Sequence, residues 1–217
     1  MNLDFSDDQK MLQESVRRFL SDKCPYEVPR RVLDGNEAYA EEVWKGLVEM
    51  GVTGAGIPEQ YGGLGLGALE LCVVAEELGR AAAPVPFSSS VYLASEAIKL
   101  FGTEAQKEAW LPKLAAGEAI GTLAYAEGTV APSPSNISVS YSGGKIEGVK
   151  MPVPDGDIAD VAVVAVRTGG SGEQGISLAI VDMKGGGVET EALKTIDPTR
   201  SHAQVTFTGA PAELMGE

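Results

Sequence analysis

Hydrophobic residues in the first half of the chain recur every three or four positions, the spacing of one face of a helix. Ser6 and Thr103 are each followed three residues later by glutamine, a pattern typical of capping boxes that predicts two helix starts. Five helices with short connections are expected, and a bundle is their natural packing. The first begins after Ser6, the second runs near Glu41 to Met50, and the third begins at about Gly67. The fourth covers about Ser90 to Phe101, and the fifth begins after Thr103.

The third of these helices carries apolar residues nearly all round, so we expect it to be buried between its neighbours. Cys72 lies in this helix and Cys24 near the end of the first. Two cysteines are too few for a disulfide framework, and both are expected to be reduced core thiols. Glu76 and Glu77 are expected on a solvated helix face.

Beyond Gly117 the pattern changes to short runs rich in β-branched residues, separated by Gly and Pro. The expected strands are Ile120 to Tyr125, Ile137 to Tyr141, Val161 to Val166, Ile176 to Val181 and Val205 to Thr208. Gly143 and Gly144 after Ser142 indicate a hairpin turn. Helices first and strands second predict the α+β class: an N-terminal helical bundle over residues 1–117, followed by an antiparallel β-barrel or sandwich domain over residues 118–217.

The net charge of the 217 residues is -14, which changes the range of functions to consider. A surface this acidic repels the phosphate groups of nucleic acids and anionic lipids. We therefore expect no nucleic-acid binding and no docking on anionic membranes. No signal peptide is visible, and Glu or Gly interrupts every apolar stretch well short of a membrane span. A cytoplasmic location is therefore expected.

Two features of the sequence that could indicate a binding or catalytic site are better explained without one. Residues Gly63 to Ala68 satisfy G-x-G-x-x-G/A, but Ile57 to Tyr61 before them is a poor strand, so a glycine turn is expected and not a dinucleotide site. His202 is the only histidine, and there is neither a Cys/His cluster nor a G-x-S-x-G segment. We expect no metal site and no Ser-His-Asp triad.

Four segments together resemble the acyl-CoA dehydrogenase family, in order and across essentially the whole chain. The most specific is P-E-Q-Y-G-G-L-G, from Pro58 to Gly65, which is similar to the family's P-E-x-Y-G-G-x-G. The others are the opening Leu3 to Gln9, the G-T-E-A-Q-K-E-A-W-L-P stretch from Gly102 to Pro112, and P-A-E-L-M-G from Pro211 to Gly216. The resemblance implies a helical domain, a β domain and a further C-terminal helical domain that is missing here.

In that family a carboxylate removes the α-proton of an acyl thioester while the β-hydrogen leaves as hydride to flavin. The carboxylate usually belongs to the C-terminal domain, so the resemblance assigns no catalytic residue in this chain. It does imply FAD on the β domain. The cofactor-binding residues expected from it are Tyr125, Ala126, Ser133, Val153 and Pro154.

Two segments of this flavin site depart from the family's pattern. Ala126 stands where T-E-P-x-A-G-S has its threonine, although the Ala126 N–H can still donate. Pro152 and Pro154 stand where G-x-K-x-W-I-T has tryptophan and threonine. Proline offers neither a hydroxyl nor an N–H, so hydrogen bonds worth on the order of 1–3 kcal/mol of cofactor affinity are lost.

The resemblance therefore implies an FAD-dependent acyl-CoA dehydrogenase subunit, incomplete and inactive as this chain alone. Its expected partners are acyl-CoA, electron-transfer flavoprotein or a similar acceptor, and dehydrogenase subunits in a homo- or hetero-oligomer. One alternative is a non-catalytic subunit that completes the site of a homologous partner, which Pro152 and Pro154 favour. A second is a stand-alone acyl-CoA binding module. Asp197 to Arg200 is read either as an Asp–Arg turn pair or as an Arg-bearing loop near the site.

Overall fold

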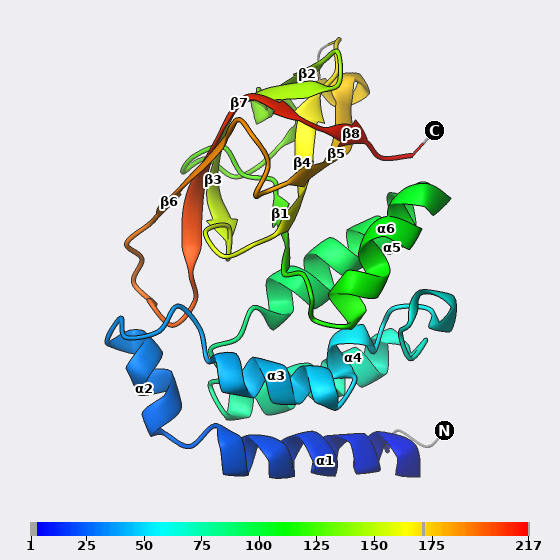
Figure 1. The fold of residues 1–217 in the computed structure, drawn as a ribbon, viewed down its shortest axis with the longest axis vertical. Coiled ribbons are helices and arrows are strands. Elements are labelled where there is room, and N and C mark those ends of the chain that lie inside the picture. Colours follow the sequence, from blue (N-terminus) through cyan, green and yellow to red (C-terminus); the bar gives the residue numbers. More distant parts are fainter. Residues whose placement is uncertain (1–3, 171, 217) are drawn as a thin grey trace.

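The computed structural model describes residues 4–170 and 172–216, and it has two layers, a group of helices and a curled sheet (Figure 1). The predicted α+β class is confirmed. The helices are α1 Asp7–Lys23, α2 Glu27–Leu33, α3 Glu41–Glu49, α4 Ala68–Arg80, α5 Glu96–Phe101 and α6 Glu104–Ala115, with short helical turns η1 Val52–Gly54, η2 Glu59–Tyr61, η4 Pro134–Asn136 and η5 Gly172–Gly175 and a π-helix, η3 Ser88–Ser95. The strands are β1 Gly121–Ala124, β2 Ser140–Ser142, β3 Lys145–Pro154, β4 Val161–Arg167, β5 Ile176–Asp182, β6 Val188–Ala192, β7 His202–Pro211 and β8 Glu213–Leu214. Leu3, at the start of the opening segment, lies outside the described residues.

Both predicted capping boxes are confirmed. The Ser6 hydroxyl accepts from the Gln9 N–H at 3.2 Å, and the Thr103 hydroxyl accepts from the Gln106 N–H at 3.3 Å. Each glutamine side chain accepts from the capping residue's own N–H in return. Sequence patterns missed α2, because it is only seven residues long and has no side-chain cap.

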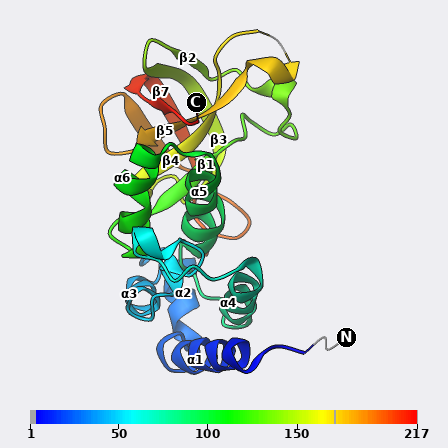
Figure 2. The ribbon, with the colours of Figure 1, turned by 90° about the vertical axis from the view of Figure 1, so that its right-hand side faces the viewer.

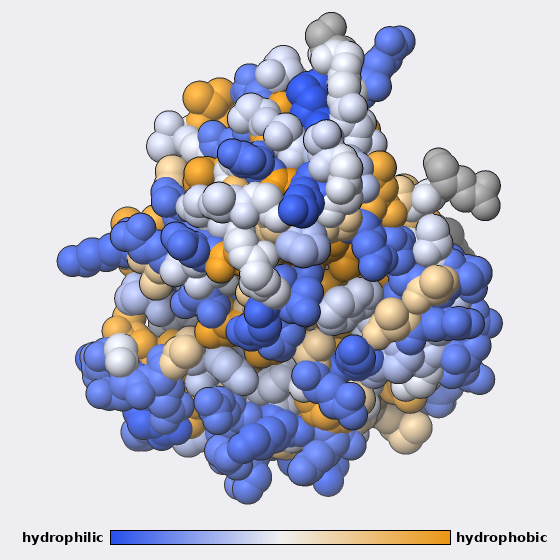
Figure 3. Space-filling view, turned by 45° about the horizontal axis from the view of Figure 1, so that its top comes forward, coloured by the Kyte–Doolittle hydropathy of each residue, from blue (hydrophilic) through white to orange (hydrophobic). Residues whose placement is uncertain are grey.

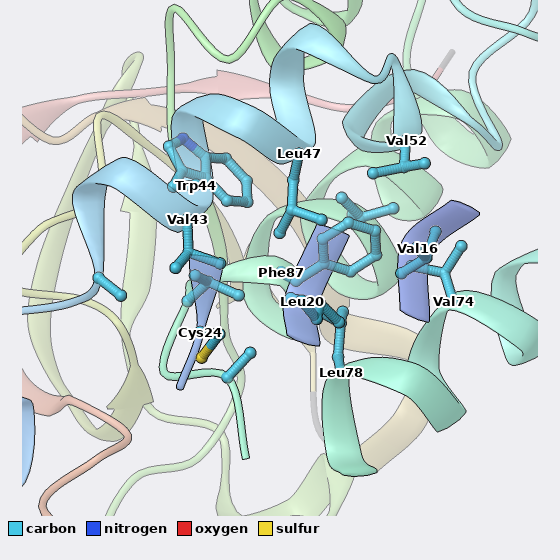
Figure 4. Close-up of a cluster of buried hydrophobic side chains, with 14 of the residues drawn as sticks. Val16, Leu20, Cys24, Val43, Trp44, Leu47, Val52, Val74, Leu78 and Phe87 are labelled. Carbon is cyan, nitrogen blue, oxygen red and sulfur yellow. The ribbon is translucent and has the colours of Figure 1, made fainter. Parts of the chain in front are cut away.

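The helices enclose an apolar core that joins α1, α3, α4 and η3 (Figure 4). Trp44 lies edge-on to Phe87, with ring centroids 6.4 Å apart. Cys24 is buried in the same core, as predicted. Aromatic rings remove large areas from water, so this pair anchors α3 to the segment that leads into η3.

Helix α4 is not buried all round, and that prediction is wrong. Val74 and Leu78 face the core, but Leu69 is 50% exposed and Cys72 lies on the surface. On its other side α4 meets η3 through Tyr92, whose hydroxyl donates to the Leu71 carbonyl at 3.0 Å. Leu71 and Ala75 of α4 line an open apolar groove of about 520 Å³ together with Leu66 and Tyr92.

Glu77 was expected on a solvated face, but its side chain is fully buried. Its two carboxylate oxygens accept from Arg17 Nη2 at 2.6 Å and Nε at 3.0 Å, and from Arg80 Nε at 2.7 Å. A buried carboxylate is stable only when it is paired in this way. The cluster joins α1 to α4, and the Arg17 hydrogen bonds hold the pKa of Glu77 below its ordinary value.

The eight strands form one sheet in the order β6-β7-β3-β2-β4-β5-β8, with β1 beside β4. Most pairs are antiparallel, while β1 and β2 each run parallel to β4. The predicted turn at Gly143 and Gly144 joins β2 to β3, and both glycines have positive φ, 57° and 78°. Strands β3, β6 and β8 were not predicted. In β3 this is because Gly148, Pro152 and Pro154 interrupt the pattern.

Strand β4 is apolar on both faces and is buried on both. Val161 and Val163 pack against Ile98, Leu111 and Leu114 of α5 and α6. Alternate residues of β4 face the inside of the curled sheet. Figure 2 shows α5 and α6 between the sheet and the remaining helices. The two layers therefore share one apolar cluster, while the division at residues 117 and 118 stays a prediction.

Glycine allows β1 to approach the helices closely. A Cβ on Gly121 would lie 2.5 Å from Ala94 Cβ and 3.1 Å from a Leu114 methyl group, so no side chain fits there. Gly63, in the P-E-Q-Y-G-G segment, is equally confined, because its Cβ would lie 2.0 Å from the Ile57 carbonyl oxygen. Residues Gly63 to Gly67 follow the turn η2 and not a strand, and they lead into α4. The expected glycine turn between helical elements is therefore present.

The face in Figure 3 is largely hydrophilic, with small and scattered hydrophobic patches. In residues 4–170 and 172–216, no helix has both the length and the apolar character that a membrane crossing needs.

Replacing Glu77 with glutamine tests the Glu77 cluster. We expect Glu77→Gln to lower the free energy of unfolding at neutral pH by about 2 kcal/mol, because charged hydrogen bonds to two arginines are lost. The pKa of Glu77 is depressed in the folded chain, so its contribution is present above the ordinary pKa and is lost as pH falls through the folded value.

Urea unfolding of the variant and the unaltered chain should therefore converge in acid. The exposed neighbour Glu76 supplies the matched control Glu76→Gln, which should change stability little. Equal effects of the two substitutions would contradict this account of the cluster.

Candidate functional site

Two segments that the sequence analysis assigned to flavin lie side by side. The Met151 N–H donates to the Ala126 carbonyl at 2.8 Å, and the Gly128 N–H donates to the Met151 carbonyl at 2.6 Å. Glu127 and Met151 thus form a parallel bridge that joins the segment after β1 to β3. Residues more than 20 positions apart in sequence are held together at this edge of the sheet.

A buried ion pair lies behind this edge. Lys150 Nζ is 2.7 Å from Glu127 Oε1, and the two side chains are 0% and 8% exposed. The carboxylate also accepts from the Ser138 N–H at 2.8 Å, the Ser138 hydroxyl at 2.5 Å and the Val139 N–H at 3.1 Å. The ammonium group also donates to the Tyr125 carbonyl at 3.2 Å. One charged pair therefore connects three segments of the β domain.

The pKa values of the pair reflect competition between burial and contact. Burial acts to raise the pKa of Glu127, but hydrogen bonds from Lys150 and Ser138 outweigh it, and the pKa lies below its ordinary value. Burial lowers the pKa of Lys150, while the Glu127 carboxylate acts in the opposite sense. A carboxylate held by this many donors is a structural anion and is poorly suited to accept a substrate proton.

The expected cofactor residues occupy different environments. Tyr125 is 38% exposed, and Ala126 and Pro154 are half-buried. Val153 is fully buried in the sheet core, so only its backbone can reach a ligand. Ser133 lies on the loop after Gly128, where its hydroxyl is 2.8 Å from that of Ser135. Tyr125, Ala126, Val153 and Pro154 are therefore gathered at one edge, and Ser133 is on a separate loop.

The donor set of this edge fits a flavin in part. Within residues 4–170 and 172–216, the Ala126 N–H has no hydrogen-bond acceptor, so it is available to a ligand. The Pro154 carbonyl is occupied by the Thr122 hydroxyl at 2.5 Å, and proline has no N–H to offer. An exposed tyrosine beside one free amide can hold the edge of a planar ring system. This edge offers fewer donors than the family's pattern supplies.

Sequence reasoning missed Asp155, the residue after Pro154. Its carboxyl is buried, and its Oδ2 lies 2.5 Å from the Ser89 hydroxyl on η3. Burial raises the pKa of Asp155 above its ordinary value. The only local signal was the Asp-Gly turn, where Asp155 has φ of 51°, a conformation that Asp and Asn tolerate. This contact ties the strand end to the helices.

A cavity of about 280 Å³ lies where the end of α4, the start of η3 and the turn before β7 meet. Its base is apolar, with Leu78, Val85 and Phe87, and Arg200 lies on the turn side. Asp197 stabilises this turn by accepting from the N–H and hydroxyl of Thr199, so the expected turn is present. The Arg200 N–H donates to the Asp197 carbonyl at 3.4 Å. The hydrogen bond from Thr199 and, more weakly, the charge of Arg200 lower the pKa of Asp197. His202 begins β7, at a strand end as expected.

Comparison with known proteins places these features in a family. A family model described as acyl-CoA dehydrogenase, N-terminal domain, matches residues 6–118, more than half of the chain. The chain belongs to the acyl-CoA dehydrogenase family. The matched part includes the P-E-Q-Y-G-G segment and all six α-helices, α1 to α6.

Curated members of the acyl-CoA dehydrogenase family match beyond that domain. The chain is 34% identical to mitochondrial isovaleryl-CoA dehydrogenase of Arabidopsis thaliana over 187 residues, 82% of this chain and 45% of the relative. It is 39% identical to (2S)-methylsuccinyl-CoA dehydrogenase of Cereibacter sphaeroides over 120 residues, 54% of this chain and 22% of that protein. The chain therefore spans about half the length of the first of these relatives.

Solved structures share the fold of this family member over its whole length. Glutaryl-coenzyme A dehydrogenase in complex with glutaryl-CoA superposes with a TM-score of 0.92 at 25% identity, covering 100% of this chain and 58% of that one. The ChsE4-ChsE5 complex of Mycobacterium tuberculosis gives 0.85 at 24% identity, with 100% and 59% coverage, and supports the fold alone.

Asp155→Asn tests the buried carboxyl. Because the pKa of Asp155 is raised on folding, its contribution to stability is present below the ordinary pKa of about 3.9 and is lost as pH rises through the folded value. Asparagine keeps a hydrogen-bonding group and the tolerance for positive φ but has no proton to lose.

The variant should therefore gain stability relative to the unaltered chain between about pH 4 and neutral, on the order of 1 kcal/mol. Urea unfolding at several pH values measures this difference. A constant difference across that range would show that Asp155 keeps its ordinary pKa.

Proposed function

We propose that this chain is a subunit of an FAD-dependent acyl-CoA dehydrogenase, with the flavin held against Tyr125, Ala126 and the end of β3. The observation that carries the proposal is the Ala126 N–H, which has no acceptor in the part of the chain that the structure describes. It lies at an exposed edge built from the segments that resemble the family's flavin motifs. Bound FAD supplies the acceptor of a hydride from the β-carbon of an acyl thioester.

In this proposal the chain's own residues bind and orient the flavin and the acyl group. The Ala126 N–H would donate to an acceptor on the flavin ring, and Tyr125 would lie beside the ring. The apolar cluster between sheet and helices keeps water out of the interior of this domain. The cavity beside Val85 and Phe87, with Arg200 at one side, has the apolar base that an acyl group needs.

The two buried glutamates do not supply the base that takes the α-proton. Glu77 is paired with two arginines and Glu127 with Lys150, so neither of these buried carboxylates is free to accept a proton. This agrees with the resemblance, which assigned no catalytic residue to this chain. Turnover by the 217 residues alone is not expected.

A non-catalytic subunit that completes a homologous partner's site is the second candidate. Pro152 and Pro154 favour it, because they remove donors and a stacking surface where flavin would lie. The electron-transfer flavoprotein type of acceptor, the homo- or hetero-oligomer and the cytoplasmic location stay predictions.

Titration with FAD separates these candidates. The chain is purified alone and after co-expression with a dehydrogenase-family subunit, and bound flavin is measured by absorbance. Binding by the chain alone supports the dehydrogenase subunit, and binding that needs the second subunit supports the non-catalytic one. Absence of flavin in both preparations would reject an FAD site on this chain.

Pro154 offers a graded test of the flavin edge. In the preparation that binds FAD, Pro154→Thr restores both an N–H and a hydroxyl and should tighten FAD binding about tenfold. Pro154→Val has the shape of threonine and the N–H but no hydroxyl, so it should gain less. The two dissociation constants are compared by calorimetry; equal values would mean that the residue 154 hydroxyl does not reach the flavin.

A further inference from the structure

The Glu127–Lys150 pair has a role beyond joining strands. Lys150 Nζ has two acceptors, the Glu127 carboxylate at 2.7 Å and the Tyr125 carbonyl at 3.2 Å. The second acceptor belongs to the Tyr125–Ala126 peptide group, the same group that carries the unpaired Ala126 N–H. A charged donor therefore fixes one end of the peptide whose other end faces a ligand.

Peptide geometry determines where the N–H points. The Tyr125–Ala126 bond is trans, since Met151–Pro152 is the cis peptide among the residues that the structure describes. In a planar trans peptide the C=O and N–H point in opposite directions. The Tyr125 carbonyl points inward to Lys150, whose side chain is fully buried, so the Ala126 N–H points away from the interior.

Glu127 prevents Lys150 from moving. Its carboxylate is held by two backbone N–H groups and a hydroxyl from Ser138 and Val139, in addition to the ammonium group. The next carbonyl, that of Ala126, is fixed by the Met151 N–H. Two consecutive carbonyls are thus held from β3, which leaves the Ala126 amide little freedom to rotate.

We propose that Lys150, held by Glu127, is a positioning residue that aims the Ala126 N–H at the flavin. The inference rests on the proposed function, because it names the ligand of that amide. In this chain the amide is the donor left at the position where the family's pattern has a threonine hydroxyl. Its orientation therefore matters more here than where the hydroxyl is present.

The test uses the preparation that binds FAD and measures both affinity and the spectrum of bound flavin. Lys150→Met keeps the length of the side chain but removes the charge, and the double variant Glu127→Gln/Lys150→Met also removes the unpaired carboxylate. Both should raise the FAD dissociation constant about tenfold, the effect of one hydrogen bond, and shift the absorbance of bound flavin. Lys145→Met, an exposed position on the same strand, is the matched control and should change neither.

The double variant separates positioning from folding. It should recover much of the stability lost in Lys150→Met, because no buried charge is left alone, yet still bind FAD weakly. A stable double variant with the unaltered dissociation constant and spectrum would overturn the inference. If neither variant folds, Glu127→Asp tests the positioning role instead. It keeps the negative charge, but its shorter side chain moves the carboxylate away from the Lys150 ammonium group. Weaker FAD binding is then expected, and unchanged binding refutes the positioning role.

Failure of the inference is distinguishable from failure of the proposed function. If the unaltered chain binds no FAD in either preparation, the proposed function is wrong and the positioning role falls with it. If the unaltered chain binds FAD and the variants bind it equally well, only the positioning role is wrong.

Discussion

The burial of β4 between two apolar layers is the interaction on which the rest of the structure depends. Its residues contact α5 and α6 on one face and the inside of the curled sheet on the other, so a single strand belongs to both cores. Burying apolar surface contributes roughly 25 cal/mol of stability per Å². A strand covered on both faces gains this stabilisation on each face. The edge that carries Tyr125 and Ala126 follows β1, which pairs with β4, so its position is fixed by that burial.

Local signals predicted the parts of the fold that local chemistry decides. Both capping boxes and the Gly143–Gly144 turn were confirmed, because each depends on residues within three positions of one another. The environment of Glu77 could not be read in this way. Its partner Arg17 lies 60 positions away, and only the packing of α1 on α4 brings the two together.

The candidate site shows the same division. Strand β3 was missed because two prolines and a glycine contradict strand propensity, yet pairing with β7 on one side overrides that local preference. The gathering of Tyr125 and Ala126 beside β3 was expected only from family resemblance. The contact of Lys150 with Glu127 and with the Tyr125 carbonyl was not foreseen, although both charged residues stand in the quoted motifs, since no sequence pattern reports which carbonyl a buried lysine reaches.

Gly121 has a consequence for motion. With no side chain there, β1 touches Ala94 and Leu114 directly, and the two layers meet without a gap along this line. A hinge motion requires an interface that can separate at a small cost in free energy. Separating this interface would expose Ile98, Leu111 and the outer face of β4 to water. Separating the helices from the sheet along this line is therefore costly. A ligand that entered past a surface turn, such as the one that carries Arg200, would leave this contact between helices and sheet intact.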